Sequence, residues 1–245
     1  MSEKIVGVIP ARLASTRLPE KVLVPLAGKP MIQHVWERAK QSKLLNDLII
    51  ACDDEKILRA ARKFGGKAIL TSKDHPSGSD RIAEVVRDLD VDIVINIQGD
   101  EPLIHHSVID NVANALLNDS SAVMATVIKI LDKKEDLNNP NVVKVVIDDH
   151  HHALYFSRAT IPYHRQVKGP VTYYKHLGLY AYRKDFLFVF KNLPKSKLER
   201  IEQLEQLRVL EAGYKIKTVE TDRETIGVDT VEDFKKVEAL LKRSS

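Results

Sequence analysis

The chain has a single cysteine, Cys52, among its 245 residues. This scarcity excludes an internal disulfide and a cysteine-based zinc site, and it fits a reducing compartment. No apolar run approaches the roughly 18 residues that span a bilayer. The N-terminus passes straight into a strand pattern, without the pattern of a signal peptide. We therefore expect a cytoplasmic protein with no membrane insertion.

A strong excess of charge of one sign is also lacking. The chain has 38 basic and 34 acidic residues, and its formal net charge is +4. An excess this small does not indicate a nucleic-acid partner, although it is compatible with anionic small molecules. The hydrophobic share of 44% and the charged share of 29% are those of an ordinary soluble globular protein. A chain of this length can bury a large core, as one α/β domain or as a main domain with a small lobe.

The glycine-rich loops of common nucleotide-binding folds are missing, yet the first strand is followed by a loop that suits phosphate. The apolar run 5–9 ends at Pro10, and the following residues place Arg12, Arg17 and Lys21 among small side chains. Cations neutralise phosphate charge, and small side chains let backbone N–H groups come close. The spacing matches neither the dinucleotide fingerprint nor the Lys-Ser/Thr phosphate loop. The stretch indicates another polyphosphate-binding fold, and a solvated basic loop is the alternative.

The first half of the chain alternates strand-like and helix-like segments. Strands are expected at 5–9, 48–51, 68–70 and 93–97. Helices are expected from Pro30, from a cap at Asp53 or Asp54, from a cap at Ser79 or Asp80, and near 108–117. This alternation predicts right-handed βαβ units and a mostly parallel sheet, with ligands at the carboxyl ends of the strands.

The second half has strand patterns with few helices between them. Strands are expected at 123–130, 142–147, 153–156 and 177–182, which suggests antiparallel additions or a small lobe. One helix is expected from Leu198 through Leu210 to Gly213, then a strand at 216–219 and a last helix from Asp229-Thr230.

Two aspartates are candidate metal ligands. Asp100 lies in Gln98-Gly99-Asp100-Glu101-Pro102, directly after a strand that should be buried. Because Mg²⁺ takes one or two carboxylates plus phosphate oxygens, an aspartate beside a polyphosphate loop suits that ion. A turn is the alternative for Asp100. In Gly227-Val228-Asp229-Thr230, the spacing instead favours a helix N-cap at Asp229 or Thr230.

Two further groups of residues suit ligands. The segment Ser77-Gly78-Ser79-Asp80-Arg81 precedes a helix, where free N–H groups can bind a phosphate or a base edge, or can merely be capped. In the second half, cations including Arg158 and His176 alternate with tyrosines, as suits an anionic sugar, although a half-buried, satisfied histidine is the alternative for His176. Nothing supports a nucleophile, because Cys52 has no evident His partner and no Gly-x-Ser-x-Gly elbow occurs.

With these residues in place, the chain resembles the CMP-Kdo synthetases, the 3-deoxy-manno-octulosonate cytidylyltransferases, nearly end to end. The matching segments are 7–21, 27–34, 77–86, 96–102, 139–146, 153–162, 176–182, 204–210 and 227–233. Two strings separate this family from general sugar-phosphate nucleotidyltransferases, namely Tyr155-Phe156-Ser157-Arg158-Ala159-Thr160-Ile161-Pro162 and Leu204-Glu205-Gln206-Leu207-Arg208-Val209-Leu210.

The resemblance implies a fold and an activity. The fold would be α/β, a mostly parallel Rossmann-like sheet of the nucleotidyltransferase type with a smaller antiparallel lobe. Within this single domain, residues 1–120 and 215–245 would form the CTP-binding core and 121–214 the sugar-binding and dimerisation lobe. The activity would be the coupling of CTP to the acidic sugar Kdo, with release of pyrophosphate, for lipopolysaccharide biosynthesis. A Mg²⁺-dependent homodimer is implied.

The resemblance also implies roles for individual residues. Arg12, Arg17 and Lys21 would hold the triphosphate, and Arg12, Lys21 and Asp100 would be catalytic. Residues that would seat the rest of the CTP are Ala11, Ser77, Gly78, Ser79, Asp80 and Arg81. Mg²⁺ would be bound by Asp100 and Asp229. The Kdo pocket would be lined by Gln98, Arg158, His176, Tyr180, Glu205 and Gln206.

One position departs from the family pattern. The phosphate loop often reads Leu-Pro-Gly-Lys in relatives, whereas this chain has Glu20 in place of the glycine. A carboxylate next to the phosphate-binding lysine should point away from the ligand. Two alternatives remain open, namely transfer to another acidic sugar and a catalytically idle nucleotide-binding protein. The presence of Lys21, Asp100 and Asp229 favours the enzyme.

Overall fold

A computed structural model describes residues 3–14, 18–165, 169 and 171–243. The chain divides into two compact units, one comprising Met1–Asp110 and Glu224–Ser245 and the other Asn111–Arg223. None of the helices within the described residues is long and apolar enough to cross a membrane.

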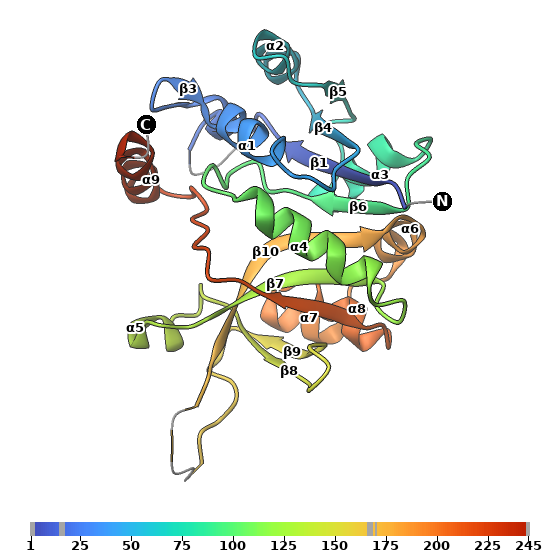
Figure 1. The fold of residues 1–245 in the computed structure, drawn as a ribbon, viewed down its shortest axis with the longest axis vertical. Helices are drawn as coiled ribbons and strands as arrows, with labels where there is room; N and C mark the ends of the chain where they lie inside the picture. The colour runs from blue at the N-terminus through green and yellow to red at the C-terminus, as the bar shows by residue number, and fades with distance from the viewer. Residues whose placement is uncertain (1–2, 15–17, 166–168, 170, 244–245) are drawn as a thin grey trace. The chain divides into compact units, whose positions relative to one another are not determined.

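The first unit is built on parallel strands in the order β6-β1-β4-β5 (Figure 1). The strands are β1 (Ile5–Ala11), β4 (Asp47–Cys52), β5 (Ala68–Leu70) and β6 (Ile93–Asn96). In register, Val8 of β1 lies opposite Ile49 on one side and Asn96 on the other. The chain moves outward from β1 to β5 and then returns to the other side of β1 as β6. Ligands of such sheets bind where the order reverses, beside the ends of β1 and β6.

The helices of the first unit follow the sequence pattern closely. They are η1 (Lys21–Leu23), α1 (Met31–Ala39), α2 (Glu55–Lys63), α3 (Gly78–Val86), α4 (His106–Leu117, which reaches into the second unit) and α9 (Val231–Arg243). The predicted apolar face of α1 is buried in full, at Met31, Ile32, Val35, Trp36 and Ala39. Asp54 caps α2 by accepting the Lys56 N–H. The prediction for α3 was wrong by two residues, because the cap is Ser77, whose hydroxyl accepts the Asp80 N–H.

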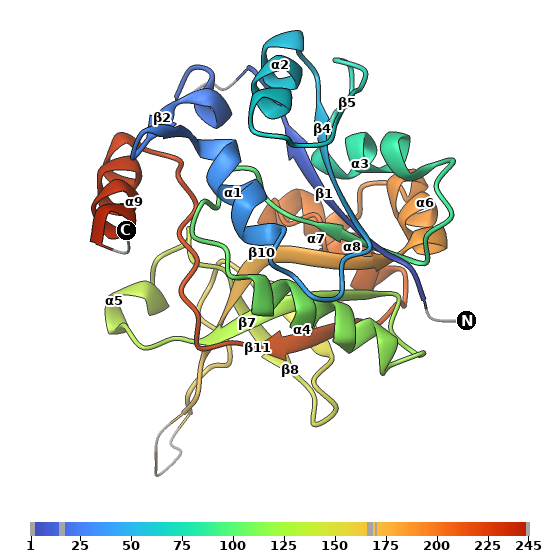
Figure 2. The same cartoon turned by 45° about the horizontal axis from the view of Figure 1, so that its top comes forward.

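The C-terminal segment is held to the first unit by an apolar cluster. Leu26 and Met31 pack with Val228, Val237 and Leu241. Leu26 belongs to the small antiparallel hairpin of β2 (Pro25–Leu26) and β3 (Lys29–Pro30). Figures 1 and 2 show α9 beside this hairpin. The packing brings residues near position 229 to the loop after β1.

The second unit is mostly antiparallel. Its strands are β7 (Met124–Ile130), β8 (Lys144–Ile147), β9 (Ala153–Ser157), β10 (Tyr174–Arg183) and β11 (Ile216–Glu220). β7 pairs antiparallel with β10 and parallel with β11, and β8 and β9 form a hairpin beside β10. Its remaining helices are α5 (Lys134–Leu137), α6 (Lys184–Asn192), α7 (Lys197–Glu202) and α8 (Leu207–Glu211). The strands of the two units confirm the predicted α/β class.

The single helix predicted from Leu198 to Gly213 is two helices in the structure. α7 ends at Glu202, and the next residue, Gln203, has the left-handed angles φ 54° and ψ 45°. α8 then begins at Leu207. Ile201, one of the apolar residues in the pattern, is 67% exposed. The Glu202 carboxylate instead accepts hydrogen bonds from Ser157 Oγ and the Arg158 N–H. These contacts with the end of β9 fix the end of α7, and helical periodicity carries no sign of them.

Candidate active site

The ammonium group of Lys21 lies between two carboxylates from distant parts of the first unit. Its Nζ is 2.5 Å from Asp100 Oδ2 and 3.1 Å from Asp229 Oδ1. The lysine side chain is only 14% exposed. Burial by itself would lower the pKa of Lys21, but the charges and hydrogen bonds of the two carboxylates outweigh it, and the pKa is raised. Lys21 therefore carries a full positive charge at neutral pH.

Local backbone contacts bring the two aspartates together. The Val228 N–H donates to the Asp100 carbonyl at 2.9 Å, which joins the segment after β6 to the segment before α9. A side chain at Gly99 would place its Cβ 3.0 Å from the Pro10 carbonyl oxygen, so the glycine allows a close approach to the end of β1. The sequence spacing favoured a cap at Asp229 or Thr230, and Thr230 is the cap, because its Oγ1 accepts the Asp233 N–H in the first turn of α9. The Asp229 carboxylate contacts Lys21 instead.

The two carboxylates fit a Mg²⁺ site whose other ligands come from a substrate. Carboxylate oxygens that already converge on one cationic atom also suit a divalent cation. Within the described part of the chain, no group of three or more His, Cys, Asp or Glu side chains could hold a metal ion. A Mg²⁺ ion at Asp100 and Asp229 would therefore need phosphate oxygens and water to complete its shell. It would also compete with Lys21 for the same oxygens.

The other predicted CTP segments lie at the same edge of the sheet. Ala11, the last residue of β1, is buried, and the Arg12 guanidinium donates to the His75 carbonyl at 2.9 Å. A Cβ on Gly78 would lie 3.5 Å from the Pro10 ring, so the start of α3 is close to the end of β1. Ser77 and Asp80 bond to each other across the first turn of α3, and Ser79 is buried. Arg17 lies outside the described residues.

The Arg81 side chain is fully buried inside the first unit and is not exposed to a ligand. Its guanidinium bonds to Thr71, Ser72 and Asp53. Asp53 was considered from sequence only as a helix cap, but its carboxylate accepts the Leu13 N–H at 2.9 Å. The only hint in the sequence is that two consecutive aspartates follow β4, of which Asp54 alone is needed as the cap.

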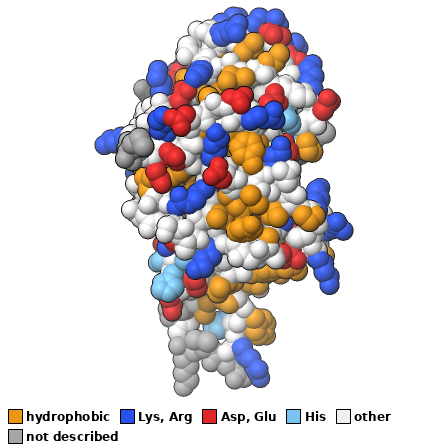
Figure 3. Space-filling view, turned by 90° about the vertical axis from the view of Figure 1, so that its right-hand side faces the viewer, with side chains coloured by type: hydrophobic (Ala, Val, Ile, Leu, Met, Phe, Trp, Pro, Cys, Tyr) orange, Lys and Arg blue, Asp and Glu red, His pale blue; other side chains and the backbone are white. Residues whose placement is uncertain are grey.

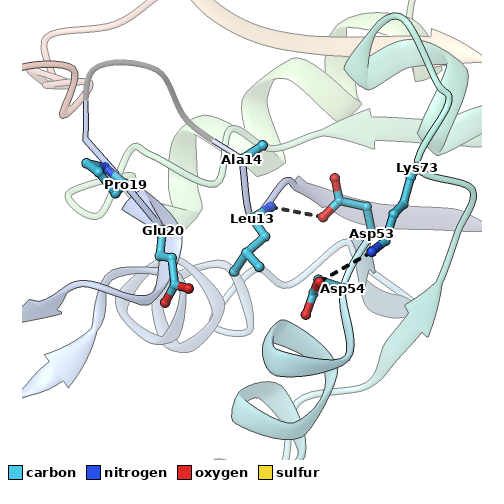
Figure 4. Close-up of a pocket in the computed structure, with 7 residues that line it drawn as sticks. All are labelled: Leu13, Ala14, Pro19, Glu20, Asp53, Asp54 and Lys73. Atoms are coloured by element: carbon cyan, nitrogen blue, oxygen red, sulfur yellow. Dashed lines mark hydrogen bonds and ion pairs between the residues drawn. The ribbon is translucent and has the colours of Figure 1, made fainter.

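A pocket of about 430 Å³ borders the loop after β1 (Figure 4). It is lined from the loop by Leu13, Ala14, Pro19 and Glu20, and from the ends of β4 and β5 by Asp53, Asp54 and Lys73. Figure 4 shows the Asp53 carboxylate reaching back to Leu13, while Asp54 pairs with Lys73 at 3.6 Å. The carboxyl-terminal edge of the parallel strands is therefore hollowed on this side of the loop.

Glu20 adopts a backbone conformation that suits glycine. Its φ of 51° and ψ of 32° lie in the left-handed region, which explains why a glycine serves well at this position. Its carboxylate pairs with Lys56 Nζ at 2.5 Å, and its orientation relative to a bound ligand stays a prediction. Both partners of that pair are about half exposed, so the pair contributes little to stability.

We expect Glu20→Gly to be more stable than Glu20→Ala by about 0.5–1 kcal/mol, because both lose the ion pair and only glycine relieves the left-handed strain. Both variants should keep kcat and the KM for CTP within about threefold of wild type, since the carboxylate contacts Lys56 rather than Lys21. Denaturant unfolding and steady-state kinetics measure these effects. An alanine variant as stable as the glycine variant would contradict the backbone assignment.

In the second unit, His176 on β10 is a neutral histidine inside an aromatic cluster. Its Nε2 lies 2.9 Å from Thr126 Oγ1, and its ring contacts Phe156 edge-on and Tyr180 at 5.4 Å between centroids. Burial lowers the pKa of His176 to about 3. A satisfied histidine was the alternative considered from sequence, and these contacts match it. A role for His176 and Tyr180 in sugar binding stays a prediction.

The depressed pKa of His176 predicts a loss of stability in mild acid. Between pH 6.5 and pH 3 the unfolded chain binds a proton at this position and the folded chain does not, so stability falls as pH falls. At pH 5 the contribution is about 2 kcal/mol. Urea unfolding at pH 7.5 and pH 5.0 should therefore show a larger loss for wild type than for His176→Gln. Equal losses in the two proteins would refute a neutral, buried His176.

Arg158 is fixed by backbone carbonyls in the second unit. Its Nε donates to the Glu202 carbonyl at 2.7 Å, and Nη1 donates to the Pro140 carbonyl at 2.9 Å. The fully buried Lys144 donates to the Arg158 carbonyl at 2.7 Å. Arg158 therefore anchors the end of β9 whether or not it also meets a sugar. The carboxylate of Glu205, another predicted sugar residue, lies 3.7 Å from the Arg208 guanidinium.

Gln206 offers a more direct sign of a ligand. It is 4% exposed, and its Nε2 is buried with no hydrogen-bond partner among the described residues. Buried polar atoms are nearly always paired, so this amide is available to a substrate hydroxyl or a water molecule. Gln98, the remaining predicted sugar residue, belongs to the first unit and follows β6.

Known proteins resemble this chain along its whole length. Residues 6–217 match the cytidylyltransferase family. The 3-deoxy-manno-octulosonate cytidylyltransferase of Syntrophus aciditrophicus (strain SB) is 50% identical over 98% of both chains. The enzyme of the same name from Solibacter usitatus (strain Ellin6076) is 48% identical over 100% of this chain and 97% of that one.

A solved structure agrees with these relatives. The structure of CMP:2-keto-3-deoxy-manno-octonic acid synthetase complexed with CTP superposes with a TM-score of 0.94 at 44% identity, covering 99% of this chain and 100% of the other. Sequence, fold and end-to-end coverage agree, and the chain belongs to the 3-deoxy-manno-octulosonate cytidylyltransferase family.

Proposed function

We propose that this protein transfers the cytidylyl group of CTP to Kdo, giving CMP-Kdo and pyrophosphate for lipopolysaccharide biosynthesis. The observation that carries the proposal is the largely buried Lys21 held between Asp100 and Asp229 at the carboxyl edge of a parallel sheet. Half of the residues of this chain are shared with relatives that bear the name of this activity. A catalytically idle nucleotide-binding protein would not need Lys21, Asp100 and Asp229 together, so their presence favours an enzyme.

In the proposed reaction, the anomeric hydroxyl of Kdo attacks the α-phosphorus of CTP. The new bond joins that oxygen to phosphorus, and the bond to the β-phosphate oxygen breaks. The hydroxyl proton passes to solvent water, and pyrophosphate carries away the electron pair. Both substrates are anions, so the site must overcome their repulsion. Arg12 and Lys21 supply positive charge at the triphosphate, and Lys21 stabilises the charge that grows on the leaving pyrophosphate.

Asp100 and Asp229 would hold a Mg²⁺ ion. When bound, the ion screens the repulsion between the substrates and lowers the pKa of the attacking hydroxyl. Positioning of the two substrates supplies much of the remaining acceleration. The mechanism requires no side chain that acts only as a base.

Residues of the second unit would recognise the sugar, and Gln98 of the first unit stays a candidate that the resemblance implies. Tyr180, Glu205 and Gln206 offer hydroxyl, carboxylate and amide groups, and the unpaired amide nitrogen of Gln206 supports this assignment. Selectivity among acidic sugars would follow because a wrong sugar leaves buried polar groups unpaired.

We also propose that the protein is a cytoplasmic homodimer that associates through the second unit. Figure 3 shows one face on which hydrophobic side chains gather between charged ones. The large hydrophobic side chains that are exposed in the described second unit include Leu154 at 60%, Ile201 at 67% and Val189 at 41%. A second copy would cover such side chains. Light scattering should then give twice the chain mass of 27.7 kDa.

The experiment that tests the activity is pyrophosphate release from CTP, with Mg²⁺ and one candidate sugar at a time. Kdo, a sialic acid and a neutral hexose form a suitable panel, and mass spectrometry identifies the nucleotide product. We expect release with Kdo and formation of CMP-Kdo. Pyrophosphate release only with sialic acid would show that the substrate is another acidic sugar and not Kdo. CTP binding without pyrophosphate release would favour a catalytically idle protein.

A further inference from the structure

The buried guanidinium of Arg81 joins two loops at the carboxyl edge of the first unit. Arg81 lies in the first turns of α3, and its side chain is 0% exposed. Nη1 donates to Thr71 Oγ1 at 2.5 Å and to the Ser72 carbonyl at 3.1 Å, in the loop after β5. Nη2 donates to Asp53 Oδ2 at 3.3 Å, at the end of β4. A charge buried this deeply is tolerated only with such partners.

Asp53 extends this network to the loop after β1. While its Oδ2 faces Arg81, its Oδ1 accepts the Leu13 N–H at 2.9 Å. Leu13 is the next residue after Arg12, whose guanidinium reaches back to the His75 carbonyl at 2.9 Å. Two connections therefore join the start of the loop after β1 to the segment between β5 and α3. One runs from Leu13 through the Asp53–Arg81 ion pair, and the other is the hydrogen bond from Arg12 to the His75 carbonyl.

The arrangement fixes the backbone that must face a triphosphate. A carboxylate that accepts a backbone N–H sets both the position and the direction of that peptide. Because Leu13 directly follows Arg12, a shift at Leu13 moves the Arg12 cation relative to the substrate. Small misplacements of catalytic groups are costly even when the mutated residue is remote from the chemistry.

We propose that Asp53 and Arg81 form a positioning pair for the CTP site, in which Arg81 orients Asp53 and Asp53 holds the backbone at Arg12 and Leu13 in the conformation that binds the triphosphate. The inference rests on the proposed use of CTP. Asp53 then has a role in CTP binding, and the Arg81 side chain acts on CTP through Asp53 instead of by direct contact.

The test compares variants at Asp53 with a matched control at Asp110. Asp53→Ala removes both contacts, whereas Asp53→Asn keeps an oxygen that can accept the Leu13 N–H and removes only the charge. Asp110 is a suitable control because its carboxylate also accepts backbone N–H groups, those of Lys43 and Leu44, in a loop before β4. Calorimetry with CTP, melting temperature and the KM of each substrate are measured for all variants.

We expect Asp53→Ala to raise the Kd and the KM for CTP at least about tenfold and to leave the KM for Kdo within about threefold. Asp53→Asn should lie between Asp53→Ala and wild type, as a rescue by the conservative variant. Asp110→Ala should lose thermal stability yet keep its Kd for CTP within about twofold. If Asp53→Ala does not fold, Asp53→Asn should still raise the Kd at least about threefold.

Two results would overturn the proposal. One is an Asp53→Ala or Asp53→Asn variant that folds and has the wild-type Kd for CTP. Any decrease in its kcat would then come only from a smaller fraction of active protein. The other is an Asp110→Ala variant that loses CTP affinity as strongly as Asp53→Ala. A wild-type protein that binds CTP but makes no CMP-Kdo would contradict the proposed function, and the comparison of Kd values would still decide the role of Asp53.

Discussion

Replacing Asp100 with asparagine is expected to reduce kcat by at least about a thousandfold and to leave the protein folded. Asparagine keeps the size of the side chain and one oxygen, but it removes the negative charge that lies 2.5 Å from Lys21. A metal-assisted transfer loses both a ligand for the cation and the charge balance around Lys21. Folding should survive because Lys21 retains Asp229 as a partner at 3.1 Å.

A matched control for this variant is Asp47→Asn. Asp47 also pairs with a lysine, Lys67, but the pair is exposed at the start of β4, away from the carboxyl edge of the strands. We expect normal activity for Asp47→Asn and only a small change in stability. Near-normal turnover of Asp100→Asn, measured by pyrophosphate release, would contradict the assignment of Asp100 to the reaction.

Lys21→Ala is expected to lower kcat by at least about a hundredfold, the effect of losing one charge-stabilising group in a desolvated site. CTP affinity should suffer less if the lysine acts mainly on the leaving pyrophosphate, where charge develops only in the transition state. The variant also leaves Asp100 and Asp229 facing each other without the cation between them. Its melting temperature should therefore rise more on addition of Mg²⁺ than that of wild type.

The control for Lys21→Ala is Lys56→Ala. Lys56 also pairs with a carboxylate of the loop after β1, that of Glu20, but it is half exposed and has no contact with Asp100 or Asp229 in the described structure. We expect activity within about threefold of wild type for Lys56→Ala. A Lys21→Ala variant that changed only the KM for CTP would show that Lys21 binds the ground state and does not act in the transition state.

Local features of the fold could be predicted because short-range physics decides them. The buried face of α1 follows from apolar spacing, and the cap of α2 at Asp54 follows from a short acceptor before a helical pattern. The break at Gln203 could not be predicted in this way. It depends on contacts between Glu202 and the end of β9, 44 residues away in sequence.

The site follows the same division. Lys21 and Asp100 could be proposed from sequence because each follows a strand of a parallel sheet, and such ends meet at one edge. For Asp229 the sequence favoured a cap, and only the packing of α9 on Leu26 and Met31 explains how it reaches Lys21. The contacts of Asp53 could not be predicted from sequence because its two partners, Leu13 and Arg81, are 40 and 28 residues away.

The most direct test of the account is a crystal structure of the protein with CTP and Mg²⁺. We predict that Asp100 and Asp229 both bind one Mg²⁺ ion at the usual distance of about 2.1 Å, and that Lys21 has left the two carboxylates for a phosphate oxygen of CTP. A structure with CTP and Mg²⁺ bound elsewhere, and with Lys21 still between Asp100 and Asp229, would contradict the account.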